Sequence, residues 1–296
     1  MRNMMIAMGL SLVGSACVQG DQEQPEDELG STEQAVNGWL EGGYTTTTAG
    51  AWNTHKDADH STCVLSQIAG NLGPGDYWDF DTDLRSAGGV SINAANGDWE
   101  VFANGGAYTN NTNDRVWAYN VVTASAVCVN YPMVPSSMKW WGSGDNPQKL
   151  ASLATVNRQC FLQAIVGGAQ IFRHSDDYVR VKRYTTTDAS HPTTGWYVEG
   201  NLVSSDVTGA PAAAKAICID FPSITDSWPS ALEVPGTHTL TSGSGIKMCG
   251  LQTVMGGYTV DTWNNGVTID PPLGLPNGQW TLTVSSGKRA RVMCVE

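Results

Sequence analysis

Three stretches of the chain combine aromatic rings with carboxylates and amides, which is the chemistry of a sugar-binding or peptide-binding surface. They are Asp76 to Asp81, Phe172 to Asp176, and Tyr258 to Asn265. A ring supplies a flat stacking area, and the polar groups beside it fix the orientation of a ligand. The predicted ligand-binding residues are Tyr77, Trp78, Phe172, His174, Tyr258, Trp263 and Asn264. The alternative is that these rings only cap the edge of a sheet.

Sequence signals for catalysis are missing. The chain has no Gly-x-Ser-x-Gly, no His-Glu-x-x-His and no phosphate-binding glycine loop that ends in Lys-Ser or Lys-Thr. A glycosidase needs two carboxylates across a cleft, and the glutamates beyond Glu41 recur at no shared place in the repeats described below. We therefore predict no catalytic residues and favour a protein that is not an enzyme. A secreted hydrolase that uses scattered Asp and His residues is the alternative.

Metal-ligand spacing is also weak. His55 and His60 flank a short charged stretch without a third ligand, and no Cys-x-x-Cys pair suggests zinc. The alternating acids of Asp79 to Asp83 could gather around calcium, but Leu84 and Val90 stand where a calcium loop of the EF type needs Gly and Glu. We predict no metal site and no cofactor, with calcium the one ion left open.

A frame of shared residues occurs three times and must position the aromatic stretches. Cys-x-Leu-x-x-(Ile/Val)-x-Gly opens the frame at Cys63, Cys160 and Cys249, and a cysteine among alternating apolar residues closes it at Cys128, Cys218 and Cys294. Between these ends lie a Val-x-(Ile/Val) step, at Val90, Val179 and Val267, and a tryptophan, at Trp99, Trp196 and Trp280. Another tryptophan precedes each opening cysteine, at Trp39, Trp141 and Trp228. A repeat of about 90 residues therefore decides the architecture.

Tryptophans within this frame are predicted to lie in the cores, because the three repeats share them. Five others fall outside the frame and are candidates for contact with a ligand: Trp52, Trp78, Trp117, Trp140 and Trp263.

The remaining pattern predicts an all-β protein. Short runs such as Val179 to Lys182 and Trp280 to Val284 alternate apolar and polar residues, which is typical of antiparallel strands with one buried face. The best helical candidate, residues 148–156, is short. We predict three tandem, disulfide-stapled antiparallel β modules, each a small sandwich or barrel, over residues 38–133, 134–223 and 224–296.

Equivalent places in the repeat predict the disulfides Cys63–Cys128, Cys160–Cys218 and Cys249–Cys294. Each would join the first and last strands of its module, in an oxidising compartment. The members of each pair are 45 to 65 residues apart. Closing a loop of that length stabilises a chain by about 4 kcal/mol in the chain-entropy model.

The amino-terminal segment has the features of a bacterial export signal. Arg2 precedes an apolar run from Met4 to Val13, and small residues follow before Cys17. We predict a signal peptide over residues 1–16 and lipidation of Cys17, the odd cysteine of seven; ordinary cleavage after Ala16 is the alternative. Residues 17–37 carry six acidic residues and no basic one, which predicts a disordered tether holding half of the formal charge of -12.

Acid-rich spacers that end in Ser-Thr-Glu-Gln-Ala, here Ser31 to Ala35, resemble those of exported myxobacterial lipoproteins. The repeat frame is similar to tandem two-cysteine, tryptophan-bearing β repeats of unassigned function in exported bacterial proteins, and this resemblance brings no catalytic residues. We expect an extracellular or outer-membrane-tethered binding or adhesion protein, with carbohydrate binding through aromatic loops. A purely structural surface protein is a further alternative. The expected partners are a glycan or cell-surface ligand and, through the lipid anchor only, a membrane; no basic footprint indicates nucleic acid.

Overall fold

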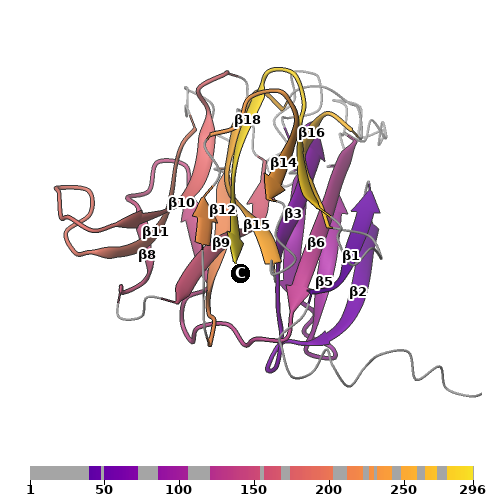
Figure 1. Ribbon diagram of the computed structural model, residues 1–296, viewed down its shortest axis with the longest axis horizontal. Coiled ribbons are helices and arrows are strands. Elements are labelled where there is room, and N and C mark those ends of the chain that lie inside the picture. The colour runs from indigo at the N-terminus through magenta and orange to yellow at the C-terminus, as the bar shows by residue number, and fades with distance from the viewer. Residues whose placement is uncertain are drawn as a thin grey trace, which may run out of the picture.

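A computed structural model describes residues 40–47, 50–72, 86–105, 121–153, 157–167, 174–202, 212–222, 227–229, 232–241, 248–258, 264–271 and 279–295. Within these residues the chain forms eighteen β-strands and no helix (Figure 1). The all-β prediction is confirmed. The described residues include no helix that is long and apolar enough to cross a membrane.

Each repeat contributes six strands. The first repeat forms β1 (Leu40–Thr47), β2 (Gly50–Asp57), β3 (Thr62–Gly70), β4 (Ala87–Ile92), β5 (Asp98–Asn104) and β6 (Val122–Val129). The second repeat forms β7 (Lys139–Gly142), β8 (Gln148–Ala151), β9 (Arg158–Val166), β10 (Tyr178–Tyr184), β11 (Gly195–Asn201) and β12 (Ala213–Asp220). The third repeat forms β13 (Ser227–Pro229), β14 (Gly236–Thr241), β15 (Met248–Gly256), β16 (Gly266–Asp270), β17 (Trp280–Val284) and β18 (Lys288–Val295). The helical candidate at residues 148–156 was wrong in its described part, because β8 pairs there with β11.

Three antiparallel sheets of six strands are shared between repeats. The first sheet has the order β1-β6-β3-β16-β17-β14, the second β2-β5-β4-β9-β12-β7, and the third β13-β18-β15-β10-β11-β8. Every sheet joins the first, sixth and third strands of one repeat to the fourth, fifth and second strands of another. The exchange closes in a ring, because β4 pairs with β9, β10 with β15, and β16 with β3.

Within a repeat, the two groups of three strands belong to different sheets and pack face to face. In the first repeat β1, β6 and β3 pack on β2, β5 and β4, with Trp99 fully buried between the layers. Its indole Nε1 donates to the carbonyl oxygen of Ser61 at 2.9 Å. Each repeat is thus a small sandwich as predicted, but its sheets continue into its neighbours. No repeat completes a six-stranded sheet with its own strands.

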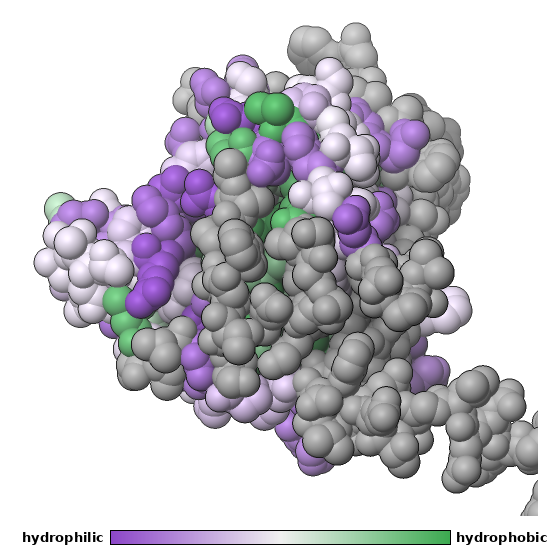
Figure 2. Space-filling view, viewed as in Figure 1, coloured by the Kyte–Doolittle hydropathy of each residue, from purple (hydrophilic) through white to green (hydrophobic). Residues whose placement is uncertain are grey.

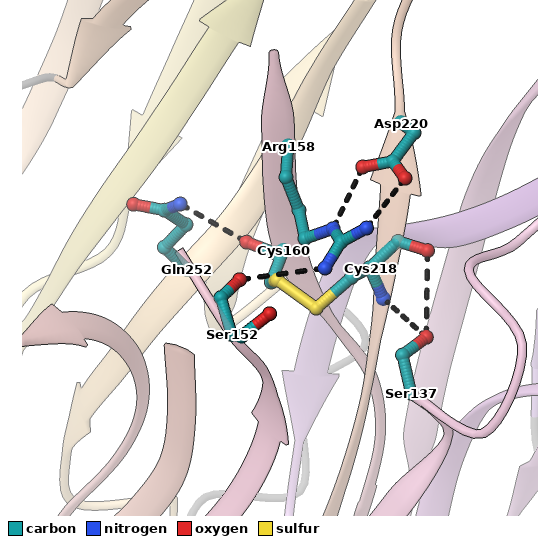
Figure 3. Close-up of a disulfide and its surroundings, with 7 residues drawn as sticks. All are labelled: Ser137, Ser152, Arg158, Cys160, Cys218, Asp220 and Gln252. Atoms are coloured by element: carbon teal, nitrogen blue, oxygen red, sulfur yellow. Dashed lines mark hydrogen bonds and ion pairs between the residues drawn. A yellow bond between two sulfur atoms is a disulfide. The ribbon is translucent and has the colours of Figure 1, made fainter. Parts of the chain in front are cut away.

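The three predicted disulfides are confirmed, with Cα separations of 4.0, 4.0 and 4.1 Å. Each joins directly opposed residues of the third and sixth strands, which are neighbours in one sheet, rather than the first and last strands. Figure 3 shows the surroundings of Cys160–Cys218. There the Gln252 side chain of the third repeat donates from Nε2 to the Cys160 carbonyl oxygen at 3.0 Å. This hydrogen bond ties the second repeat to the third.

The third strands β3, β9 and β15 also contact one another, so they form the centre of the molecule. The residue after the opening cysteine is Val64, Phe161 or Gly250, and these three side-chain positions meet. A Cβ atom on Gly250 would lie 2.6 Å from Phe161 Cδ1 and 2.9 Å from Val64 Cγ2. Glycine in one repeat therefore makes room for phenylalanine in another.

The glycine that ends the opening motif also has a steric reason. Gly70 has φ of +98°, and a Cβ atom there would lie 1.8 Å from the carbonyl oxygen of Val121. Only glycine allows this close approach of two backbones.

Candidate ligand-binding faces

The predicted aromatic stretches begin where the three central strands end. These ends meet, because the Leu72 N–H donates to the Tyr258 carbonyl oxygen at 2.9 Å, and a Cβ atom on Gly167 would lie 2.0 Å from the Leu72 carbonyl oxygen. Four predicted ligand-binding residues, Tyr77, Trp78, Phe172 and Trp263, lie outside the described residues, as does the acidic stretch considered for calcium.

His174 and Asn264 are exposed at this end of the molecule, but Tyr258 is fully buried. The prediction that Tyr258 offers a ring to a ligand was wrong. The Lys288 ammonium lies 4.5 Å from the centre of this ring, and it donates to the Gly257 carbonyl oxygen at 2.8 Å and to Asn265 Oδ1 at 2.9 Å. Burial lowers the pKa of Lys288 to about 8. Tyr258 and Lys288 therefore hold the end of the third repeat together.

Tryptophan burial follows the division predicted from the frame. The frame residues Trp99, Trp141, Trp196 and Trp280 are all buried. Of those outside the frame, Trp52 and Trp140 belong to the described residues, with relative exposures of 56% and 48%. A tryptophan that only one repeat carries is thus on the surface wherever the structure describes its side chain.

Strand register aligns one row of side chains across each sheet. In each sheet the row contains the residue four positions after the opening cysteine, which is Ala164, Thr253 or Gln67. Its partner on the strand from the neighbouring repeat is Gly89 in the second sheet, Arg180 in the third and Thr268 in the first. This alignment corrects the predicted Val-x-(Ile/Val) step in the first repeat. Gly88 and Val90, rather than Val90 and Ile92, are equivalent to Val179 and Val181.

The three rows have different chemistry. The row of the second sheet, here called the aromatic row, consists of Trp140, Lys215, Ala164, Gly89 and Phe102. The row of the third sheet, here called the charged row, consists of Arg291, Thr253, Arg180 and Glu199. The row of the first sheet, here called the hydroxyl row, consists of Ser125, Gln67, Thr268, Thr283 and Thr237. Equivalent positions of the three sheets thus carry three different sets of side chains.

An exposed ring and a buried amine lie side by side in the aromatic row. Trp140 of β7 pairs with Lys215 of β12, and the Lys215 ammonium lies 5.6 Å from the centre of the indole ring. Lys215 is only 8% exposed, and burial lowers its pKa. Among the residues that the structure describes, no carboxylate lies within ion-pair distance of Lys215. Because no described carboxylate neutralises it, the Lys215 ammonium keeps hydrogen-bonding capacity beside the ring.

The middle of the aromatic row carries almost no side-chain bulk. Gly89 lies opposite Ala164, and a Cβ atom on Gly89 would lie 2.3 Å from the Ala164 Cβ. Phe102 follows on the far side and is half-buried. Phe102, Glu199 and Thr283 occupy equivalent positions, three residues after the frame tryptophan of their repeat.

Glu199 of the charged row is 7% exposed at its side chain and lies at the centre of a hydrogen-bond network. Its Oε1 accepts from Arg180 Nε and from the Tyr184 hydroxyl, both at 2.6 Å, and its Oε2 contacts His191 Nε2 at 2.8 Å. Burial alone would raise the pKa of Glu199, but these hydrogen bonds outweigh it and the pKa is lowered. His191 also stacks on the Tyr184 ring at 3.6 Å between ring centres. The network therefore holds the segment between β10 and β11 against the sheet.

This network resembles a catalytic arrangement only in composition. His191 Nδ1 contacts Asp188 Oδ1 at 2.9 Å while Nε2 contacts Glu199, so neither ring nitrogen is left to take a proton from a substrate. Within the described ranges, no group of three or more His, Cys, Asp or Glu could hold a metal ion.

Sequence reasoning missed Lys215 and the Glu199 network. The adjacent tryptophans Trp140 and Trp141 were a signal for the former, because neighbouring residues of a strand point to opposite faces. Glu199 gave no comparable signal, since its partners come from three places in the chain.

Comparison with known proteins found no matching family model, no matching curated protein and no matching solved structure.

Proposed function

We propose that the protein is an exported binding or adhesion protein that binds a glycan at the Trp140 end of the aromatic row. The observation that carries this proposal is the pairing of an indole ring, 48% exposed, with a buried lysine that has no carboxylate partner among the described residues. The ring supplies area for stacking on the apolar face of a sugar, and the ammonium donates hydrogen bonds to its hydroxyl or carboxylate groups.

The surroundings of this pair favour an extended ligand. Ala164 and Gly89 leave the middle of the row free of long side chains, and Phe102 offers a second ring beyond them. The chain enters β4 from the stretch with Tyr77 and Trp78 and leaves β9 towards Phe172. Two of the three stretches chosen from the sequence therefore adjoin central strands of this same sheet.

An exported location agrees with the disulfides. All six cysteines of the repeats are paired, which suits an oxidising compartment. Lipidation at Cys17 would then tether the binding domain to the outer membrane through its acidic segment. The variant Cys17→Ser should release the protein into the aqueous phase on detergent partition. A native protein whose mature chain begins at Cys17 with a free thiol would contradict lipidation.

The binding test is a glycan and polysaccharide screen of residues 38–296, with and without calcium. For the ligands found, Trp140→Ala should weaken binding at least about tenfold, as loss of a central aromatic contact does. Trp52→Ala is the matched control, because it removes a tryptophan of similar exposure from the opposite edge strand of the same sheet. Equal losses in both variants, or in neither, would contradict a site at Trp140.

A further inference from the structure

Cations gather on the outer face of the third sheet, away from the aromatic row. Five of the chain's 16 lysines and arginines lie on this face: Arg289, Arg291, Arg180, Lys182 and Lys149. Strand register places them on one side, because Arg291 and Arg180 both flank Thr253, and Lys182 and Lys149 both flank Tyr197. Figure 2 shows strongly hydrophilic residues on the side of the molecule where β8, β10 and β11 lie.

Most of this positive charge is not neutralised by described side chains. Among the described residues, the carboxylates of Glu199 and Asp188 lie on this face, and they are engaged by Arg180 and by His191. No described carboxylate lies within ion-pair distance of Arg289, Arg291 or Lys182. The charge of this face is thus opposite to that of the whole chain, which is -12.

Aromatic rings hold two of the cations in place. Arg180 lies over the Tyr178 ring at 4.8 Å, and Lys182 lies over the Tyr184 ring at 4.6 Å. Such contacts restrict the conformations of a long side chain before any ligand is present. Less conformational entropy is then lost when that side chain binds a ligand. Tyr184 is itself fixed by its hydrogen bond to Glu199. The charged row therefore prepares a cationic surface as well as holding its own loop.

We propose that this face binds an anionic polysaccharide, a polymer whose sugars carry carboxylate or phosphate groups. Arg289 and Arg291 are two residues apart on β18, or about 7 Å, and Arg180 lies two strands from Arg291, or about 10 Å. Separate cations at this spacing suit a chain with charges at intervals along its sugars. The site is distinct from the aromatic row, and it does not rest on glycan binding there.

Charge density separates this ligand from a nucleic acid. Duplex DNA carries one negative charge per about 1.7 Å. The protein has a net charge of -12, so its surface outside this cationic face repels a polyanion of that charge density. A polysaccharide with fewer charges per unit length suffers less of this repulsion. Because the attraction acts between charges at or near the surface, salt largely screens it beyond about 8 Å at physiological ionic strength.

The experiment measures binding of the full chain, made soluble by Cys17→Ser, to polygalacturonate, to a phosphorylated dextran, to uncharged dextran and to duplex DNA. Binding to one or both charged polysaccharides is expected at about 0.05 M NaCl and should be lost near 0.5 M, where screening is strong. Arg289→Ala with Arg291→Ala should weaken binding by roughly tenfold or more. Lys139→Ala removes one exposed charge from β7 of another sheet and should leave binding within about twofold.

Tighter binding to DNA than to either polysaccharide would overturn the proposal, as would equal binding to uncharged dextran. Should the double arginine variant melt at a lower temperature, Lys182→Gln, which changes a half-buried residue on the same face, takes its place. Unchanged affinity in that variant would also overturn it. Trp140→Ala should not alter binding to polygalacturonate, and this keeps the test separate from that of the aromatic row.

Discussion

The aromatic row and the charged row occupy equivalent positions of the same architecture, yet they use charge in opposite ways. In the charged row, Glu199 receives hydrogen bonds from Arg180 and Tyr184 and contacts His191, so its charge is fully compensated. In the aromatic row, Lys215 is also buried and lies beside the Trp140 ring, but none of the described carboxylates is within ion-pair distance of it. The register that the repeats share therefore fixes where a side chain lies, and the individual repeat decides whether a buried charge there has partners of opposite charge among the described residues.

The largest effect is expected from a buried tryptophan of the repeat frame. Trp196→Ala, beneath the charged row, should lower the free energy of unfolding by roughly 3 to 5 kcal/mol, because it removes a buried ring from a sandwich core. Thermal or urea unfolding measures this loss. If the variant unfolded like the wild type, a tryptophan shared by the three repeats would not mark a position that stabilises the core.

A smaller loss is expected from the centre of the charged row. Glu199→Ala leaves the Arg180 guanidinium and the Tyr184 hydroxyl without their acceptor and should cost about 2 to 3 kcal/mol. Glu199→Gln keeps an acceptor and should cost less. If Glu199→Ala were as stable as the wild type in urea, the charged row would not stabilise the fold through Glu199.

The same residue predicts a pH dependence. The pKa of Glu199 is lowered in the folded protein, so between that value and the unfolded value of about 4.3 the unfolded chain binds more protons. Its contribution to stability is therefore present above this range and is lost as the pH falls through the folded pKa. Urea unfolding as a function of pH should show a shallower acid decline in Glu199→Gln. An unchanged decline would mean that other carboxylates dominate.

Removing the positive charge of Lys215 from the aromatic row should raise the stability of the fold or leave it unchanged. Lys215→Met keeps the stem and removes a buried cation that has no carboxylate partner among the described residues, so stability should stay the same or rise by up to about 1 kcal/mol. Melting temperature measures this. A clear loss of stability would show that Lys215 supports the fold as Glu199 does.

Much of this architecture could be predicted from the sequence, because the repeats mark equivalent places. Cys63 and Cys128 were paired correctly, and Trp99 and Trp196 were correctly assigned to cores. The exchange of strands between repeats could not be predicted, since the pairing of β4 with β9 depends on three-dimensional packing that leaves no periodic signal.

The surfaces were harder to predict than the frame. Tyr258 follows two glycines at the end of a strand, and nothing in the sequence shows that its ring is buried and that Lys288 packs over it. The row of Trp140 and Lys215 joins residues 75 positions apart, and its members become neighbours only through the register of β7 and β12.

The most direct test of the central claim is a titration of the protein with each glycan found in the screen, followed by the indole N–H resonances of its tryptophans. The Trp140 resonance should shift on binding while those of the buried Trp196 and Trp280 stay in place. Lys215→Met should weaken the affinity without lowering the melting temperature. A glycan that binds without moving the Trp140 resonance would contradict the central claim.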